Sequence, residues 1–215
     1  MTDKETNINA VAHKPRIGLF PGTFDPVHTG HMVFAIKALK EAKLDALYFL
    51  PERRPRSKPE VTHFGHRTAM LTRAIRPYTN LGVLELPDMY FDVKRTLPKL
   101  QKEFAGSELV FLLGSDTVLK MNQTNWPAED LQTFLGQTSL VIGLRSNRKR
   151  RELNDALKNL PVQPKSLQIL ELPTRHLSSS RIRNSFRRGQ KADGLLASVQ
   201  AYARSNWLYI SLAGE

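Results

Sequence analysis

Two histidines three positions apart follow an apolar run near the start of the chain and could bind phosphate. The run begins at Ile17 and ends at Pro21-Gly22, and after a turn His28 and His31 precede apolar residues at helical spacing. This segment, IGLFPGTFDPVHTGH, predicts a strand, a turn and a helix. The first turn of a helix carries free N–H groups and a partial positive charge, which attract phosphate. Two imidazoles at i and i+3 share one face of that turn and can both donate to phosphate oxygens.

Two other interpretations of the histidine pair are idle surface side chains and a metal site. The chain has no cysteine, and no further histidine or acidic residue stands close by at ligand spacing, which does not favour zinc. Gly22-Thr23 and the proline-bounded turn favour phosphate, because glycine lets the backbone approach a ligand closely. We therefore predict a phosphate site and no metal site made by the protein itself.

A second candidate phosphate site lies near the C-terminus, in the segment LSSSRIR from Leu177 to Arg183. Its three hydroxyls and the first N–H groups of the helix that it opens can hold phosphate oxygens. Arg183 can add a bidentate contact. The alternative is a serine cap on a cationic helix, which the residues alone leave equally open.

The elements that must position these residues alternate between strands and helices. Apolar runs predict strands at 17–20, 45–51, 81–86, 108–113, 139–144 and 167–172. Helical patterns occupy 33–43, 64–76, 93–104, 117–121, 128–135, 150–160, 178–188 and 193–205, although Pro98 disfavours a helix at its position. This order predicts an α/β fold, a Rossmann-like doubly wound parallel sheet in a single domain. Ligands of such sheets bind beyond the carboxyl ends of the strands, where the special residues fall: 22–31, 51–58, 114–116, Arg145 and 178–183.

Composition limits the classes of function. The 215 residues fit one domain at 16–215 after a polar, flexible extension at 1–15 that is not a secretory signal. No apolar stretch approaches the roughly 18 residues of a membrane helix, and a cytoplasmic location is the default expectation. The net charge of +12 indicates either nucleic acid or small polyanionic substrates. The sequence lacks the interleaved aromatic and basic residues that would indicate a nucleic-acid-binding surface. It leaves open whether the protein forms a homo-oligomer.

The two phosphate segments carry a resemblance to a known superfamily. GTFDPVHTGH resembles the G-T-F-D-P-x-H-x-G-H signature of the nucleotidyltransferases that include class I aminoacyl-tRNA synthetases. LSSSRIR is similar to the I-S-S-T-x-I-R signature, which binds the triphosphate of ATP in that superfamily. The resemblance implies catalytic roles for His28, His31 and Arg183. The ATP-binding set that it implies is Gly22, Thr23, Phe24, His28, His31, Gly114, Asp116, Ser178, Ser179 and Arg183.

Further segments resemble the nicotinate mononucleotide adenylyltransferases in particular. They are Pro51-x-x-x-Pro55-x-x-Lys58, His66-Arg67-x-x-Met70, Trp126, Val141 to Arg145, Tyr202 and Leu208-Tyr209. The resemblance implies transfer of AMP from ATP, with Mg²⁺, to nicotinate mononucleotide, which gives the dinucleotide and pyrophosphate. The acceptor-binding residues that it implies are Lys58, Phe91, Asp92, Thr96, Trp126 and Arg145.

The chain departs from that family at three places. Pro21 replaces a glycine, Arg56-Ser57 replace Pro-His, and the acceptor segment Y-T-x-x-T-L appears as residues 91–97. A carboxylate at Asp92 is expected to repel the carboxylate of nicotinate. Other acceptors therefore stay open, namely nicotinamide mononucleotide, phosphopantetheine or a sugar phosphate. A basic nucleic-acid-binding protein on an inactive scaffold is the alternative from another class.

Overall fold

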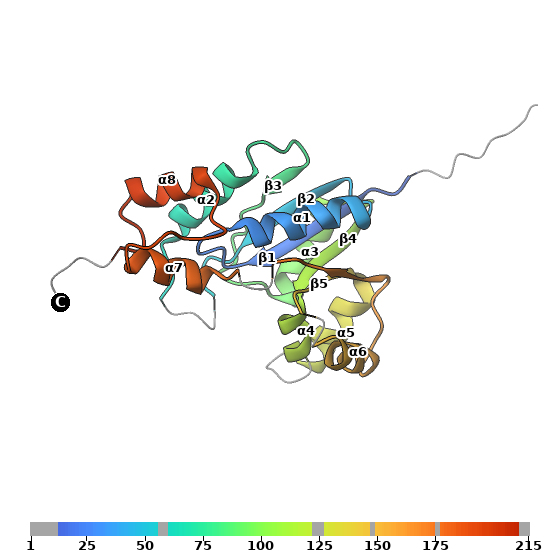
Figure 1. The fold of residues 1–215 in the computed structure, drawn as a ribbon. Helices are drawn as coiled ribbons and strands as arrows, with labels where there is room; N and C mark the ends of the chain where they lie inside the picture. Colours follow the sequence, from blue (N-terminus) through green and yellow to red (C-terminus); the bar gives the residue numbers. More distant parts are fainter. Residues whose placement is uncertain (1–12, 56–59, 122–126, 147–148, 175–176, 211–215) are drawn as a thin grey trace, which may run out of the picture.

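A six-stranded parallel sheet forms the centre of the molecule (Figure 1). The computed structural model describes residues 13–55, 60–121, 127–146, 149–174 and 177–210. The strand order is β3-β2-β1-β4-β5-β6, the order of a doubly wound sheet, which confirms the predicted fold class. The strands are β1 (Arg16–Gly22), β2 (Ala46–Pro51), β3 (Leu81–Val83), β4 (Glu108–Gly114), β5 (Ser139–Leu144) and β6 (Leu167–Glu171).

Helices cover both faces of the sheet. They are α1 (Thr29–Glu41), α2 (Phe64–Ile75), α3 (Val93–Glu103), α4 (Ser115–Met121), α5 (Ala128–Gln137), α6 (Arg150–Lys158), α7 (Ser179–Arg187) and α8 (Ala197–Ser205). Helices α1, α2 and α8 share one core cluster with the sheet, whereas α3 to α6 share the other. Along β4, Val110 and Leu112 enter the first cluster and Phe111 and Leu113 the second. Burial on both faces explains why this strand is a continuous apolar run.

The sheet opens where β1 meets β4. β1 pairs with β2 as far as Gly22↔Pro51, but its pairing with β4 ends at Leu19↔Phe111. β4 continues along β5 to Gly114↔Gly143. The carboxyl ends of β1 and β4 therefore separate at the point where the strand order reverses, which is where doubly wound sheets bind ligands.

Several expected boundaries were wrong, and three of them differ by three or four residues. α1 begins at Thr29 rather than Val33, because His28 caps it. β3 ends at Val83 rather than Leu86, because the carbonyl of Leu86 turns away to accept a hydrogen bond from Arg53 Nε. α8 begins at Ala197 rather than at 193, because Gly194 has a φ of +78°, which no α-helix contains. Within the part of the chain described, no helix has the length and apolar character needed to span a membrane.

Pro98 does not break α3. The helix runs from Val93 to Glu103 with Pro98 exposed at its surface. Its buried stripe consists of Val93, Thr96, Leu97 and Leu100, all packed on the sheet side. Burial of these side chains compensates for the one backbone hydrogen bond that proline cannot donate.

Gly194 fastens the start of α1 to the segment before α8. Its carbonyl accepts hydrogen bonds from the backbone N–H of Thr29 at 2.8 Å and from Thr29 Oγ1 at 3.0 Å. A Cβ on Gly194 would collide with the Leu177 side chain. Both the positive φ and this close approach require glycine.

We expect Gly194→Ala to destabilise the protein more than Gly106→Ala. Both glycines have φ near +80°, so alanine costs about 1–2 kcal/mol of unfolding free energy at either position. A Cβ on Gly106 meets nothing within 4 Å, whereas at Gly194 it collides with Leu177, which adds about 1–3 kcal/mol. Urea denaturation of the two variants measures the difference, and equal losses would contradict the packing role.

Candidate active site

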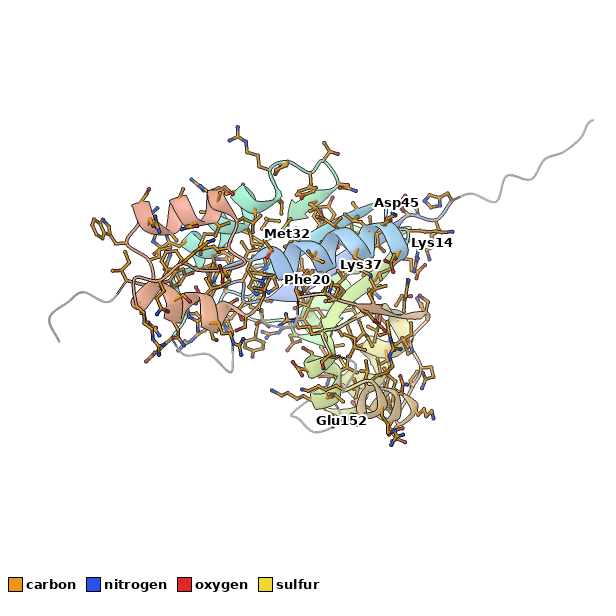
Figure 2. The ribbon with its side chains drawn as sticks, in the orientation of Figure 1. Lys14, Phe20, Met32, Lys37, Asp45 and Glu152 are labelled. Atoms are coloured by element: carbon orange, nitrogen blue, oxygen red, sulfur yellow. The ribbon has the colours of Figure 1, made fainter. Side chains whose placement is uncertain are left out.

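The loop between β1 and α1 and the first turn of α1 carry His28 and His31 at the open edge of the sheet. Phe20 at the end of β1 and Met32 in α1, both labelled in Figure 2, flank this loop and belong to the same core cluster. The loop therefore has packed anchors on both sides. Its backbone and the two imidazoles are held at the carboxyl end of β1, as the sequence predicts.

The two histidines cap α1 reciprocally. His28 is the N-cap, and its Nδ1 accepts from the backbone N–H of Gly30 at 3.1 Å. His31 Nδ1 accepts in turn from the backbone N–H of His28 at 3.3 Å, and the rings stack with centroids 3.8 Å apart. With Nδ1 accepting, the proton of each neutral ring sits on Nε2. The caps therefore set both tautomers and make each Nε2–H a hydrogen-bond donor.

Burial keeps His28 neutral. The residue is 1% exposed, and this burial, followed by the positive charge of Arg145, lowers the pKa of His28 to about 4. The side chain thus donates to an anion through Nε2 at neutral pH without carrying a full charge.

Aromatic rings and two glycines define the space around the imidazoles. The Phe24 ring meets His31 edge-on with centroids 5.1 Å apart, and Phe24 adopts a φ of +51°, which is unusual for a bulky residue. A Cβ on Gly22 would lie 2.8 Å from the Phe24 ring, and one on Gly30 would lie 2.9 Å from the His28 ring. Both glycines are needed for these ring positions.

The serine–arginine turn packs directly against the histidine loop. Ser179 Oγ donates to the carbonyl of Pro26 at 3.0 Å, and Arg183 Nη1 donates to the carbonyl of Asp25 at 2.7 Å. Ser178 caps α7 by accepting from the N–H of Arg181 at 3.3 Å. The start of α7 therefore contacts the loop before α1, and the two predicted phosphate segments lie side by side.

Arg145 also reaches this site. It follows β5, and its Nη1 donates to the carbonyl of Leu177 at 3.4 Å, just before Ser178. Its charge acts on His28, as described above. The sequence resemblance placed Arg145 with the acceptor, and the structure places it beside the histidine and serine segments.

A buried carboxylate that sequence reasoning did not select lies at the centre of the loop. Asp25 is 2% exposed and accepts from the hydroxyl of Tyr209 at 2.6 Å and from the backbone N–H of Thr62 at 3.2 Å. Arg183 Nη1 lies 3.9 Å from its Oδ2. Asp25 belongs to the signature segment, so its motif position was the one available signal.

Arg67 was likewise missed as a site residue. Its guanidinium is fully buried and donates to the carbonyls of Thr23, Arg53 and Thr62 at 2.7, 3.0 and 2.9 Å. One side chain therefore ties the loop after β1 to the loop after β2. The H-R-x-x-M segment was noticed in the sequence, but only as a mark of resemblance.

The predicted residues after β4 lie at a more open part of the edge. A Cβ on Gly114 would meet nothing within 4 Å, so space remains above the end of β4. Asp116, in the first turn of α4, accepts from Lys149 Nζ at 2.6 Å. A role for Asp116 at a ribose hydroxyl would require its carboxylate to serve both partners.

The predicted acceptor segment is engaged in capping α3. Asp92 accepts from the N–H of Arg95 at 3.0 Å and forms an ion pair with the Arg95 guanidinium at 3.5 Å. Thr96 is fully buried, accepts from the N–H of Asp92 and donates to Asp88. Phe91 packs edge-on against Phe111. Arg95 thus offsets the charge of Asp92, whereas Lys58 and Trp126 lie outside the described residues.

We expect the stability of the protein to fall as the pH drops from 6.5 to 4 because of His28. The unfolded chain, with an ordinary histidine pKa of 6.5, binds a proton in this range that the folded state excludes. By pH 4.5 this costs about 2–3 kcal/mol of unfolding free energy.

His28→Asn is the matched variant, because asparagine also caps helices but does not titrate. Urea denaturation at pH 7 and pH 4.5 compares the two proteins. The stability gap between them should shift by about 2–3 kcal/mol in favour of the variant at the lower pH. An unchanged gap would show that His28 titrates normally.

Comparisons with known proteins agree with this geometry. The cytidylyltransferase-like family model matches residues 19–185. A protein of Neisseria gonorrhoeae described as "Probable nicotinate-nucleotide adenylyltransferase" is 30% identical over 202 residues, covering 90% of this chain and 98% of the relative. A protein of Moorella thermoacetica with the same description is 28% identical, covering 94% and 95%.

Solved structures share the fold. The nicotinic acid mononucleotide adenylyltransferase of Plasmodium falciparum, in complex with NaAD, superposes with a TM-score of 0.72 at 19% identity, covering 92% of this chain and 98% of that one. The structure of the same enzyme in complex with APC superposes with a TM-score of 0.71 at 17% identity, and it covers 92% of this chain and 98% of that one. Taken with the family model and the relatives, this establishes that the chain belongs to the cytidylyltransferase-like nucleotidyltransferases and, among them, to the nicotinate-nucleotide adenylyltransferase family.

Proposed function

We propose that this protein transfers the adenylyl group of ATP to nicotinate mononucleotide, which gives nicotinate adenine dinucleotide and pyrophosphate in NAD biosynthesis. The observation that carries the proposal is the junction of α7 with the loop before α1. There Ser179 and Arg183 bond to the Pro26 and Asp25 carbonyls, beside the stacked imidazoles of His28 and His31. The names of the relatives support the choice of reaction.

The ATP phosphates would bind between the two helix N-termini. His31 Nε2–H would donate to the α-phosphate, and His28 Nε2–H to the phosphates further out. Ser179 and Arg183 would hold the outer phosphates, with the first N–H groups of α7. The remaining members of the ATP set line the loop after β1, the cap of α7 and the edge after β4: Gly22, Thr23, Phe24, Ser178, Gly114 and Asp116.

The transfer itself needs alignment more than proton movement. An oxygen of the acceptor phosphate forms a bond to the α-phosphorus, while the bond to the bridging oxygen breaks and pyrophosphate leaves with its electron pair. The acceptor phosphate is already ionised at neutral pH, so no general base is required. The side chains of the site would hold the reactants in line and stabilise the charge that develops on the α-phosphate.

Mg²⁺ is part of the proposal as a companion of ATP. Across the described residues, no group of three or more His, Asp or Glu side chains could hold a metal ion. The one buried carboxylate in the loop, Asp25, is already engaged with Tyr209 and Thr62. The side chains of the site therefore fit an Mg²⁺ ion that is bound by phosphate oxygens and water. The ion would neutralise part of the triphosphate charge.

The acceptor would lie on the β2–β3 side of the opening. Hydrogen bonds from Arg53 Nε to the carbonyl of Leu86 and from the Arg54 N–H to the carbonyl of Met89 join the loops after β2 and β3 there. These loops lead to Lys58 and to the segment with Phe91, Asp92 and Thr96. The pairing of Asp92 with Arg95 weakens the repulsion that its carboxylate would exert on nicotinate.

The basic cluster after β5 does not call for a nucleic-acid function. Lys149 pairs with Asp116, and Arg150 pairs with Glu171. Both cations are therefore matched by acidic side chains of the same molecule, which lowers the positive field of this surface. We adopt no second function.

We expect nicotinate mononucleotide to be the preferred acceptor. Pyrophosphate release from ATP is measured with a coupled assay for a panel of acceptors: nicotinate mononucleotide, nicotinamide mononucleotide, phosphopantetheine and a sugar phosphate. The largest kcat/KM is expected for nicotinate mononucleotide. A larger value for any other member would reassign the acceptor, and no release with any of them would overturn the proposed function.

Removal of the His31 Nε2 donor should lower kcat by about 100- to 1,000-fold, the usual effect of losing one donor to a developing oxyanion. His31→Asn is the informative change, because the asparagine Oδ1 can still accept from the His28 N–H and preserve the cap. His31→Ala should lose both, with only a modest change in ATP affinity.

His63→Asn is the control for the His31 variants. His63 caps α2 in the same manner, by accepting from the N–H of Gly65 at 3.3 Å, but it donates nothing to the candidate phosphate site. Its turnover should equal that of the wild type. A His31→Asn variant with wild-type kcat would remove His31 from the chemistry.

A further inference from the structure

The last described segment of the chain places the phenol of Tyr209 against Asp25, in the loop between β1 and α1. Residues 206–210 follow α8, and within them Trp207 and Tyr209 have φ values of +53° and +64°. Such left-handed backbone is unusual for bulky aromatic residues and persists only where surrounding contacts hold it. For Tyr209 these contacts include the Phe186 ring at 5.9 Å and the 2.6 Å hydrogen bond to Asp25 Oδ1. Figure 1 shows α7 and α8, which flank this segment, at the same end of the molecule.

Tyr209 serves as a donor to Asp25. Burial, followed by the nearby Asp25 carboxylate, raises the pKa of the Tyr209 phenol well above its usual range, so the hydroxyl keeps its proton. The other carboxylate oxygen, Oδ2, accepts from the Thr62 N–H at 3.2 Å. Thr62 is held by Arg67 Nε, which donates to its carbonyl at 2.9 Å. Each oxygen of Asp25 therefore has a donor that is anchored elsewhere in the fold.

Arg183 lies beside this carboxylate but does not form a close pair with it. Its Nη1 is 3.9 Å from Asp25 Oδ2, whereas the same nitrogen donates at 2.7 Å to the Asp25 backbone carbonyl. Its Nη2 makes a longer contact, 3.4 Å, with Ser180 Oγ. The Arg183 side chain is 22% exposed, so part of it is accessible to solvent and to a ligand.

The direction of the Asp25 carboxylate decides how Arg183 can act. Carboxylates and guanidinium groups favour a two-bond pair, and a short rotation of Asp25 would supply one. In that pair both nitrogens of Arg183 would face Asp25, and fewer donors would remain for a phosphate. The donors on Oδ1 and Oδ2 oppose this rotation.

We infer, on the basis of the proposed adenylyl transfer, that Tyr209 is a positioning residue for the triphosphate. By holding Asp25 Oδ1, it keeps the carboxylate from closing onto Arg183 and leaves the guanidinium free to bind the outer phosphates of ATP. The C-terminal segment thereby contributes to nucleotide affinity without touching the nucleotide.

The test is Tyr209→Phe, which keeps the ring and removes the donor. The ATP dissociation constant, measured by titration calorimetry without acceptor, is expected to rise about tenfold, and KM for ATP should rise with it. KM for nicotinate mononucleotide should not change. In an Arg183→Lys background, where the two-bond pair cannot form, Tyr209→Phe should cause no further loss of ATP affinity.

Tyr202→Phe is the matched control. It removes a tyrosine hydroxyl from the same part of the chain, one that bonds to His66 Nδ1 at 2.9 Å rather than to the phosphate loop. It should lower the unfolding free energy comparably and leave ATP affinity unchanged.

Three results would overturn the inference: wild-type ATP affinity in Tyr209→Phe, equal losses of affinity in both tyrosine variants, or a full further loss in the Arg183→Lys background. Absence of pyrophosphate release from the wild type would instead count against the proposed function, because the calorimetric comparison does not need an acceptor.

Discussion

The site depends on the use of an imidazole nitrogen as a helix cap. Serine, threonine and aspartate are the usual caps, and their role is complete once the side-chain oxygen has accepted a hydrogen bond from a backbone N–H. His28 accepts from the Gly30 N–H through Nδ1 and keeps its proton on Nε2, and His31 Nδ1 accepts in return from the His28 N–H. The hydrogen bonds that start α1 thus also orient the two donors. The start of the helix and the orientation of the two imidazoles therefore depend on the same hydrogen bonds, and Gly22 and Gly30 leave room for the rings.

Local patterns were sufficient to predict the sheet and the position of the histidine segment at the carboxyl end of β1. The continuous apolar run of β4 reflects burial on both faces, and the alternation with helices allows few other arrangements. The sequence could not predict that Arg67 joins Thr23, Arg53 and Thr62, because a single arginine in a helical pattern has no local sign of burial. It also could not pair Asp25 with Tyr209, 184 positions away, since such contacts exist only after the chain has folded. The early end of β3 has the same cause, a distant partner for Leu86.

The basic residues behind the net charge of +12 have different roles in the structure. Arg67 is entirely internal and gives its donors to backbone carbonyls, so it acts as a cross-link rather than as a surface charge. Lys149 and Arg150 are matched by acidic partners. Arg183 contacts the loop before α1 and Arg145 contacts Leu177 before α7, where the two helix N-termini add their own partial charges. Two arginines and two helix N-termini therefore bring positive charge to the open edge between β1 and β4, which favours the binding of a polyanion.

The fastening of Thr29 to Gly194 has a consequence for how the protein is made. Synthesis delivers β1, α1 and the whole sheet well before residue 194 leaves the ribosome, and nascent domains begin to fold as they emerge. During that interval the first turn of α1 lacks two of its hydrogen bonds and the partner surface that carries them. The sheet can thus be complete before the loop that carries His28 has its C-terminal contacts, which form only when the segment after β6 docks.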